Sequence, residues 1–282
     1  MKAGFIGAGK VGCTLGTYFI QNDIPVMGFY SRTQASASEA AAQCNTTHIE
    51  TIDKLITMCD VLFLTVPDDA IAEVWEQVKA FPVKGKYICH CSGSLTSAVL
   101  SGIEDAEAYG YSIHPMFPFK SKKTAYEDLA QALFTIEGNA AHMSDMIDFL
   151  HLCPNKIVEI RKSDKEKYHG AAVFASNLVV GLMNQALDLL CECGFDKADA
   201  LCALKPLAIQ NLNNIFRAGP EGALTGPVER HDMETVRKHL KVLDSEKKET
   251  YKILTKEIID LAQHRHPEIS YMDMKQLLEE EK

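Results

Sequence analysis

The chain lacks any apolar run close to the about 20 residues that a membrane-spanning helix needs. Positive charge is also scarce, because 29 Lys and Arg face 38 Asp and Glu, for a formal net charge of −9. The amino terminus reads as a core strand and not as a charged leader with a cleavage site. We therefore expect a cytoplasmic protein with no membrane or nucleic-acid partner, whose anionic ligands are held by local pockets.

Paired metal-binding cysteines are missing as well. The nine cysteines are odd in number and contain no C-x-x-C pair. The C-x-C pair Cys89 and Cys91 lies in an expected strand, with His90 on the opposite face, so no tetrahedral site is built locally. The sequence predicts reduced, mostly buried thiols and no metal.

The 282 residues, 46% apolar and 24% charged, are enough for two domains. Strand and helix signals alternate in the first half and cease after about residue 160. We expect an α/β fold with a doubly wound parallel Rossmann sheet over 1–160, then an all-helical domain over 161–282. The expected strands are 24–30, 46–49, 61–66, 87–91, 107–113, 131–137 and 156–160, after a first strand ending at Ile6, and the expected helices between them are 34–44, 51–58, 69–79 and 139–152.

A glycine-rich turn follows the first strand. It reads Gly7-Ala8-Gly9-Lys10-Val11-Gly12 and opens an amphipathic helix. In this pattern Gly7 permits the tight turn, Gly9 lets a pyrophosphate approach the backbone, and Gly12 lets the helix pack against the strand. The free N–H groups of the helix end then attract the phosphates. The turn predicts a dinucleotide site, and the alternative is a glycine turn that only packs.

The end of the second strand indicates which nucleotide is bound. An NAD-selective site places Asp or Glu there, whereas this chain has Ser31 and Arg32. A guanidinium beside a hydroxyl suits the adenosine 2′-phosphate, so we expect NADP (as NADPH) and not NAD. A solvated surface arginine is the alternative. Val66 and Pro67, which end the strand 61–66, are further expected cofactor contacts.

The second half begins with a capping-box pattern at Ser163 and Glu166 and a long helix over 167–193. Few charges lie between residues 170 and 187, so this helix is expected to be buried on most sides. Because few helices remain to cover it, we infer a homodimer in which it meets a second copy. The further expected helices are 196–219, with a kink at Pro206, and 233–244, 246–263 and 272–280.

Candidate catalytic residues lie in both halves. Ser92 and His114 follow strands of the sheet, where ligands of doubly wound folds lie. His169 and Asn177 share a face of the long helix with Val173, and polar groups on so apolar a helix need partners, such as a substrate carbonyl. The alternative for each is a packing role.

A loop between helices, residues 223–232, offers further donors. Thr225 and Arg230 are suited to a substrate carboxylate or phosphate, and Asp232 is expected to cap the next helix. Glycine and proline at this density also mark a plain connection between helices, which is the alternative.

Together these motifs resemble a group of bacterial proteins that join a Rossmann-like NADP-binding domain to a helical domain of formerly unknown function. The residues that carry the resemblance are the glycine turn with Ser-Arg-Thr at 31–33, Val-Pro-Asp-Asp at 66–69, Ser-Gly-Ser at 92–94, Ile-His-Pro-Met at 113–116, Tyr168 to Asn177, and Leu-Thr-Gly-Pro-Val-Glu-Arg at 224–230. The group is similar in architecture to ketopantoate reductase, pyrroline carboxylate reductase and the β-hydroxyacid dehydrogenases.

The resemblance implies NADPH-dependent reduction of a small 2-oxo acid, with ketopantoate (2-dehydropantoate) as the leading substrate. In ketopantoate reductases and β-hydroxyacid dehydrogenases a catalytic Lys stands one turn before the helical Asn, whereas this chain has Val173 there. The proton donor is then His169 or His114, with Asn177 and Ser92 orienting the carbonyl and Thr225 to Arg230 holding the carboxylate. An imine reductase and a non-catalytic NADP(H)-binding sensor are the alternatives.

Overall fold

The computed structural model describes residues 1–121 and 126–280. It divides into two compact units, Met1–Ala175 and Ser176–Lys282. The expected domain boundary at residue 160 lies one helix before this division. The helix over Lys165–Ala175 therefore belongs to the first unit, together with the sheet.

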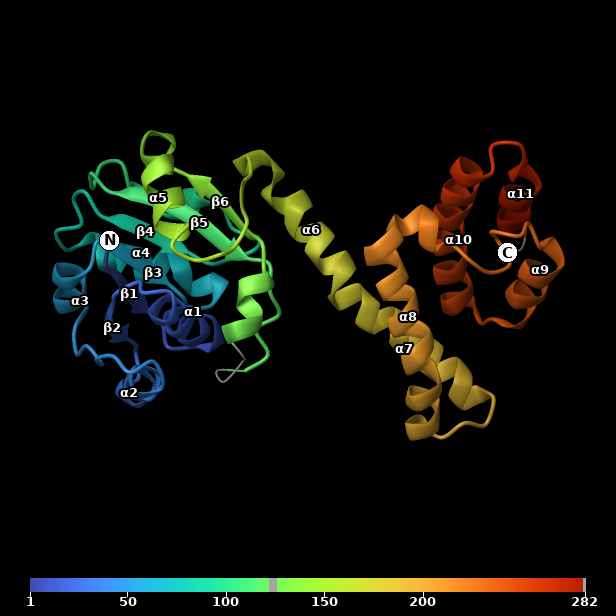
Figure 1. Ribbon diagram of the computed structural model, residues 1–282, viewed down its shortest axis with the longest axis horizontal. Coiled ribbons are helices and arrows are strands. Elements are labelled where there is room, and N and C mark those ends of the chain that lie inside the picture. Colours follow the sequence, from blue (N-terminus) through green and yellow to red (C-terminus); the bar gives the residue numbers. More distant parts are fainter. Residues whose placement is uncertain (122–125, 281–282) are drawn as a thin grey trace. The chain divides into compact units, whose positions relative to one another are not determined.

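A seven-stranded sheet forms the centre of the first unit (Figure 1). Its strands are β1 (Ala3–Ile6), β2 (Val26–Tyr30), β3 (Val61–Leu64), β4 (Tyr87–His90), β5 (Tyr109–Pro115), β6 (Phe134–Gly138) and β7 (Ile157–Glu159). They lie in the order β2-β1-β3-β4-β5-β6-β7. The expected doubly wound Rossmann sheet is confirmed, except that β6 runs antiparallel to β5, whereas the sequence predicted a wholly parallel sheet.

Helices cover both faces of this sheet, as a mostly parallel sheet requires. They are α1 (Lys10–Gln21), α2 (Gln34–Gln43), α3 (Ile52–Met58), α4 (Ile71–Lys79) and α5 (Met143–Leu150), followed by α6 (Lys165–Ala175). Side chains of α1, α2 and α5 share one core with the strands, and side chains of α3 and α4 share another. The expected strand at 46–49 is wrong, because only His48 forms a bridge, to Phe29 beside it.

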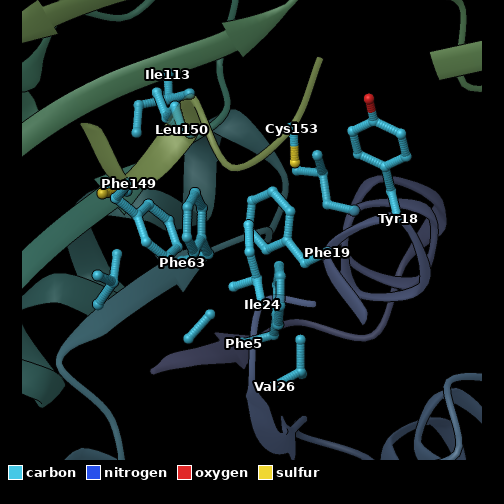
Figure 2. Packing of buried hydrophobic residues seen from close by; sticks show 14 of the residues in the cluster. Phe5, Tyr18, Phe19, Ile24, Val26, Phe63, Ile113, Phe149, Leu150 and Cys153 are labelled. Carbon is cyan, nitrogen blue, oxygen red and sulfur yellow. The ribbon is translucent and has the colours of Figure 1, made fainter. Parts of the chain in front are cut away.

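Aromatic side chains fill the core under α1 and α5 (Figure 2). The ring of Phe5 stacks on Phe29 and Phe63 at centroid distances of 5.1 and 5.3 Å. Phe19 and Phe149 approach the same group edge-on. Burying each ring contributes about 1.5–3 kcal/mol, so this cluster is a main source of the unit's stability.

The second unit contains five helices among its described residues: α7 (Asn177–Glu192), α8 (Lys197–Ala223), α9 (Met233–Val242), α10 (Ser245–Arg265) and α11 (Met272–Glu280). The expected continuous helix over 167–193 is wrong in one respect, because Ser176 has non-helical angles and separates α6 from α7. Asp196 caps α8, and Gly219 interrupts it near the expected end. Pro206 lies inside α8 without a non-helical residue beside it.

The α9, α10 and α11 helices close on an apolar core of their own, shown together in red at the carboxyl-terminal end of the chain in Figure 1. By contrast, α7 buries none of its side chains, and α8 buries only Ala200 and Ala223. The prediction that the helix over 167–193 is buried on most sides is therefore wrong for a single chain.

Large apolar side chains are consequently exposed on this part of the protein. They include Phe174, Leu178, Val180, Leu182, Phe195, Leu201, Leu207, Ile209, Leu212 and Phe216. By length and composition the helical stretch Lys162–Glu192 also passes the test for a membrane span, contrary to the expectation of no such stretch. Core helices of water-soluble proteins pass the same test, so this is weak evidence for a membrane.

Candidate functional site

The glycine-rich turn has the geometry that its sequence predicts. Gly7 adopts a φ of +106°, and a Cβ there would lie 2.5 Å from the carbonyl oxygen of Thr65. A Cβ on Gly12 would lie 2.5 Å from both the Gly7 carbonyl oxygen and the Thr65 hydroxyl. Thr65 in turn donates a hydrogen bond to the Gly7 carbonyl at 2.8 Å. Only glycine fits at these two positions, and together they fix the start of α1 against β3.

The backbone at Gly9 is open, unlike the backbone at Gly7 and Gly12. A Cβ on Gly9 meets nothing among the described residues nearer than the Thr65 carbonyl oxygen, at 3.9 Å. Gly9 caps α1 without a side-chain hydrogen bond, and no acidic residue lies in the first turn. The helix end thus presents unscreened N–H groups where a pyrophosphate can approach closely, which fits a dinucleotide. Ala8, Lys10 and Val11 belong to this same turn.

A hollow of about 340 Å³ lies beyond the end of β2. It is lined by Tyr30, Ser31, Arg32, Gln34, Ala37, His48, Ile49 and Glu50. The Glu50 carboxylate is held by Lys54 at 2.9 Å, whereas Arg32 is exposed. Ser31 and Arg32 therefore present a hydroxyl and a guanidinium to one hollow, which fits a phosphate ester in the predicted place.

The loop after β3 joins this turn to the end of β4. Val66 lies against the turn, since its Cγ1 would be 3.1 Å from a Gly7 Cβ, and Pro67 precedes the short helix Asp68–Ala70. Asp68 accepts hydrogen bonds from the hydroxyls of Ser92 at 2.6 Å and Ser94 at 3.0 Å. Ser92 stands at the predicted edge, with its proton directed to Asp68.

Two histidines meet at the end of β4. A Cβ on Gly93 would lie 2.8 Å from Nδ1 of His169 and 3.0 Å from Nε2 of His114, so both nitrogens lie close to one point beside Gly93. Nδ1 of His114 forms a 2.7 Å hydrogen bond with the Tyr168 hydroxyl. Nδ1 of His169 is buried and has no hydrogen-bond partner among the described residues. A buried nitrogen of this kind is costly unless a ligand satisfies it.

The electrostatics of this edge keep His90 and His114 neutral. Burial, reinforced by the charge of Lys165, lowers the pKa of His114 to about 4. Burial also lowers the pKa of His90 to about 4, and His90 is fully buried between the backbone of Thr96 and Ser92. His114 is therefore suited to donate or accept a proton as an uncharged imidazole, whereas His90 holds the loop in place.

Lys165 and Tyr168 were not predicted as functional members of this cluster, whereas Asp68 lies at a strand end where candidates were expected. Lys165 reads as a solvated residue at a helix start, yet it is fully buried and its Nζ donates to Ser112 Oγ at 2.7 Å. Its spacing one turn before His169 was the available signal, because i and i+4 side chains share a helix face.

The remaining predicted residues belong to the second unit. Asn177 begins α7, and its Oδ1 accepts a hydrogen bond from Ser176 at 3.0 Å. Thr225 and Arg230 are both exposed in the loop before α9. Asp232 caps α9 through the N–H of Thr235, as predicted. Substrate roles for Asn177, Thr225 and Arg230 stay predictions.

Along the carboxyl edge of the sheet, these contacts form one continuous row. Gly7 touches Thr65 and Val66 after β3, Asp68 of that loop bonds to Ser92 and Ser94 after β4, and Gly93 between them adjoins the two histidines. The row joins the glycine-rich turn to the two histidines along the edge of the sheet where ligands of doubly wound folds lie.

Comparisons with known proteins agree with this architecture. Residues 1–115 match the family model of the Rossmann-like domain, and residues 132–258 match that of the domain of unknown function DUF2520. No curated protein sequence matches the chain.

Solved structures resemble the chain over almost its whole length. A Thermotoga maritima protein is 26% identical with a TM-score of 0.75, covering 94% of this chain and 99% of its own. A Bacteroides fragilis protein described as a candidate NADP oxidoreductase is 22% identical with a TM-score of 0.70, covering 92% and 98%. Plasmodium falciparum pyrroline carboxylate reductase, solved with NADP bound, is 13% identical with a TM-score of 0.59, covering 94% and 96%. In the order of the chain, a segment that matches the Rossmann-like domain (residues 1–115) is thus followed by one that matches DUF2520 (residues 132–258).

Proposed function

We propose that this protein is an NADPH-dependent oxidoreductase that reduces a small carbonyl or imino acid. The observation that carries the proposal is the row of contacts from the Gly7 turn to the two histidines beside Gly93. Its support includes the resemblance in fold to an NADP-bound pyrroline carboxylate reductase and to an imine reductase with NADP⁺ from Myxococcus stipitatus. In such a reaction the bound nicotinamide supplies a hydride, and the protein supplies orientation and a proton.

The cofactor is held by two separate parts of the first unit. Backbone N–H groups at Gly9 to Gly12 receive the pyrophosphate, and the open backbone of Gly9 lets it approach. Ser31 and Arg32 receive the adenosine 2′-phosphate in the hollow at the end of β2. A bidentate guanidinium contact to a phosphate favours NADPH over NADH.

The proton comes from the histidine pair. Ring nitrogens of His114 and His169 both lie close to Gly93, and a carbonyl oxygen bound in contact with both rings would satisfy the orphaned Nδ1 of His169 if that nitrogen carries a proton. General acid catalysis by a placed imidazole contributes about 10²–10⁴-fold in rate. Asp68 and Ser92 shape the loop around this point, and Asn177 keeps its predicted role in orienting the substrate.

The leading substrate is a 2-oxo acid such as ketopantoate, as the sequence resemblance implies. Exposed donors on Thr225 and Arg230 are assigned to its carboxylate. A cyclic imino acid is the second candidate, favoured by the resemblance to pyrroline carboxylate reductases from Plasmodium falciparum and Coxiella burnetii. A protonated imine needs less acid catalysis than a ketone, which agrees with Val173 in place of a lysine.

A second copy of the chain is proposed to cover the exposed side chains of α7 and α8. On α8, Ile209, Leu212 and Phe216 recur at i, i+3 and i+7, and Phe216 is 86% exposed. Two helices with only two buried residues cannot form a core alone, whereas two such hairpins from two copies form a four-helix core with twofold symmetry. This proposal includes a homodimer in the cytoplasm, and a bilayer is the competing cover.

The test is a cofactor titration followed by a substrate panel. Purified protein is first titrated with NADPH and NADH, and NADPH is expected to bind at least tenfold more tightly. The loss of NADPH absorbance is then followed with ketopantoate, other 2-oxo acids and cyclic imino acids. Turnover of one class identifies the substrate class, and tight NADPH binding without any turnover supports the sensor alternative instead.

A further inference from the structure

Lys165 is a fully buried lysine that the proposed function does not use. Its Nζ donates to the neutral hydroxyl of Ser112 at 2.7 Å. The carboxylates of Glu137 and Asp68 act on it through space, without a hydrogen bond to it. Lysine is almost never fully buried unless paired, because desolvating an ammonium is costly. A residue that a structure retains at such cost calls for an explanation in the site beside it.

Lys165 belongs to a face of α6 that docks on β5. Lys165, Tyr168 and His169 stand at i, i+3 and i+4 and so share one side of the helix. Ser112 and His114 are alternate residues of β5 and so share one face of the sheet. Each of the first two α6 residues bonds to one of these β5 residues, since Lys165 bonds to Ser112 and Tyr168 bonds to His114. The docking therefore fixes the imidazole of His114 from one side.

Both partners of the Tyr168–His114 hydrogen bond are neutral at pH 7, so either the Tyr168 hydroxyl or Nδ1 of His114 can donate. Burial raises the pKa of the Tyr168 hydroxyl, so this group keeps its proton. His114 is neutral at pH 7, because burial and Lys165 lower its pKa. Where Tyr168 is the donor and Nδ1 of His114 the acceptor, the one imidazole proton lies on Nε2. Nε2 is the ring nitrogen that lies close to the point beside Gly93.

We propose that Lys165 and Tyr168 are positioning residues that hold His114 as the neutral Nε2–H tautomer, with this proton directed at the point it shares with His169. The inference rests on the proposed function for its chemical meaning. As the carbonyl carbon receives the hydride, the Nε2–H bond breaks and an O–H bond forms on the substrate oxygen. The Tyr168 proton passes to Nδ1, so His114 stays neutral, and one proton taken up from solvent then restores the Tyr168 hydroxyl.

Lys165 favours both the transient phenolate of Tyr168 and the neutral form of His114. Its Nζ lies 5.7 Å from the centre of the Tyr168 ring, where a positive charge favours the transient phenolate. The same charge opposes protonation of His114, as does His169 of α6, whereas Asp68 after β3 favours it. Two of the three charged or titratable groups that act on His114 thus keep it neutral, and burial adds to them.

The test is nuclear magnetic resonance of the ¹⁵N-labelled histidine rings in the full-length protein. Long-range ¹⁵N–¹H correlations distinguish the two tautomers, and His114→Gln assigns the signals. In the wild type, His114 is expected as the Nε2–H tautomer without titration above about pH 5. In Lys165→Met the acid dissociation constant of His114 is expected to fall at least about tenfold. The matched control, Lys162→Met, removes an exposed lysine one turn earlier and should leave His114 unchanged.

Tyr168→Phe separates the second positioning role from the first. It removes the donor to Nδ1 but keeps the ring, so His114 is expected to remain neutral while its tautomers mix. Should Lys165→Met fail to fold, the wild-type spectrum and Tyr168→Phe still decide the proposal. An Nδ1–H tautomer in the wild type, or a titration near pH 6.5, overturns it, as does an unchanged tautomer in Tyr168→Phe.

The spectra need neither cofactor nor substrate, so this proposal and the proposed function fail separately. If the protein shows the expected tautomer but binds no NADPH, the positioning of His114 is confirmed and its role in reduction is contradicted. If the protein reduces a substrate with NADPH but His114 is the Nδ1–H tautomer, the proton transfer from Tyr168 is contradicted and the proposed function stands. Once a substrate is known, Lys165→Met should shift the acid limb of the pH profile of kcat/KM toward higher pH, with Lys162→Met again as control.

Discussion

The sheet of the first unit and the α7–α8 pair of the second differ in how far their apolar side chains are buried. Helices cover both faces of the sheet, and rings such as Phe5, Phe19 and Phe63 are fully buried. The α7 and α8 helices bury only Ala200 and Ala223 and leave apolar side chains such as Leu207 and Phe216 exposed. The first unit therefore covers its apolar core with its own helices, whereas α7 and α8 need cover from outside the chain.

The largest expected effect is on the free energy of unfolding and concerns the apolar core of the first unit. Phe63→Ala removes a ring packed between Phe5 and Phe19 and should lower the free energy of unfolding by about 3–5 kcal/mol. Val242→Ala, at a side chain that is 79% exposed, should change it by less than about 0.5 kcal/mol. Urea denaturation of both variants measures the difference, and equal losses would contradict the location of the core.

The exposed apolar face of α8 is tested by whether two copies of the chain associate through it. Ile209→Glu with Phe216→Glu places two charges on the exposed face of α8 and should convert a dimer into monomers of 31.2 kDa. Val242→Glu and Met272→Glu, on exposed side chains of α9 and α11, are the matched control and should leave the dimer intact. Sedimentation velocity measures both. A wild type that is monomeric, or that partitions into lipid vesicles, would argue against a second copy as the cover.

The cofactor preference depends on one exposed arginine of the first unit. Arg32→Ala should weaken NADPH binding by about 10- to 100-fold, because a charge-assisted phosphate contact contributes about 1.5–3 kcal/mol. NADH binding by the same variant should change little, since NADH lacks the 2′-phosphate. Isothermal titration of both nucleotides gives the two values, and an equal loss for NADH would mean that Arg32 does not recognise the phosphate.

The smallest expected effect concerns pH. The pKa of His90 and of His114 is about 4 in the folded chain and about 6.5 when unfolded, so the unfolded state binds more protons between these values. Stability should therefore fall as the pH drops from about 6.5 to 4, by about 1–3 kcal/mol for each histidine. Urea denaturation of His90→Gln over this range should show a shallower dependence than the wild type; an identical one would contradict the lowered pKa.

Local signals in the sequence were sufficient to predict the sheet and the cofactor turn. The spacing of Gly7, Gly9 and Gly12 has one physical meaning between a strand and a helix, and the structure shows the close approaches that it implies. The cap at Asp232 and the start of a helix near Asp196 were likewise readable, because a helix start depends on neighbours in sequence. Alternating apolar segments gave the strand and helix order for the same reason.

Features that depend on distant contacts could not be predicted in this way. The reversed direction of β6 is set by its pairing with β5, and nothing in its five residues records it. Lys165 looks like any surface lysine until Ser112, more than fifty residues earlier, is placed beside it. The exposure of α7 depends on what the other helices cover, which periodicity alone does not give.

The most direct test of the central claim compares wild type and His114→Gln for NADPH oxidation across 2-oxo acids and cyclic imino acids, with NADPH binding measured in parallel. We predict turnover of at least one class by the wild type. For His114→Gln we predict unchanged NADPH affinity and a rate lower by about 10²–10⁴-fold on a ketone. Tight NADPH binding without turnover of any substrate, or full activity in His114→Gln, would contradict the claim that the edge of the sheet beside Gly93 carries out a reduction.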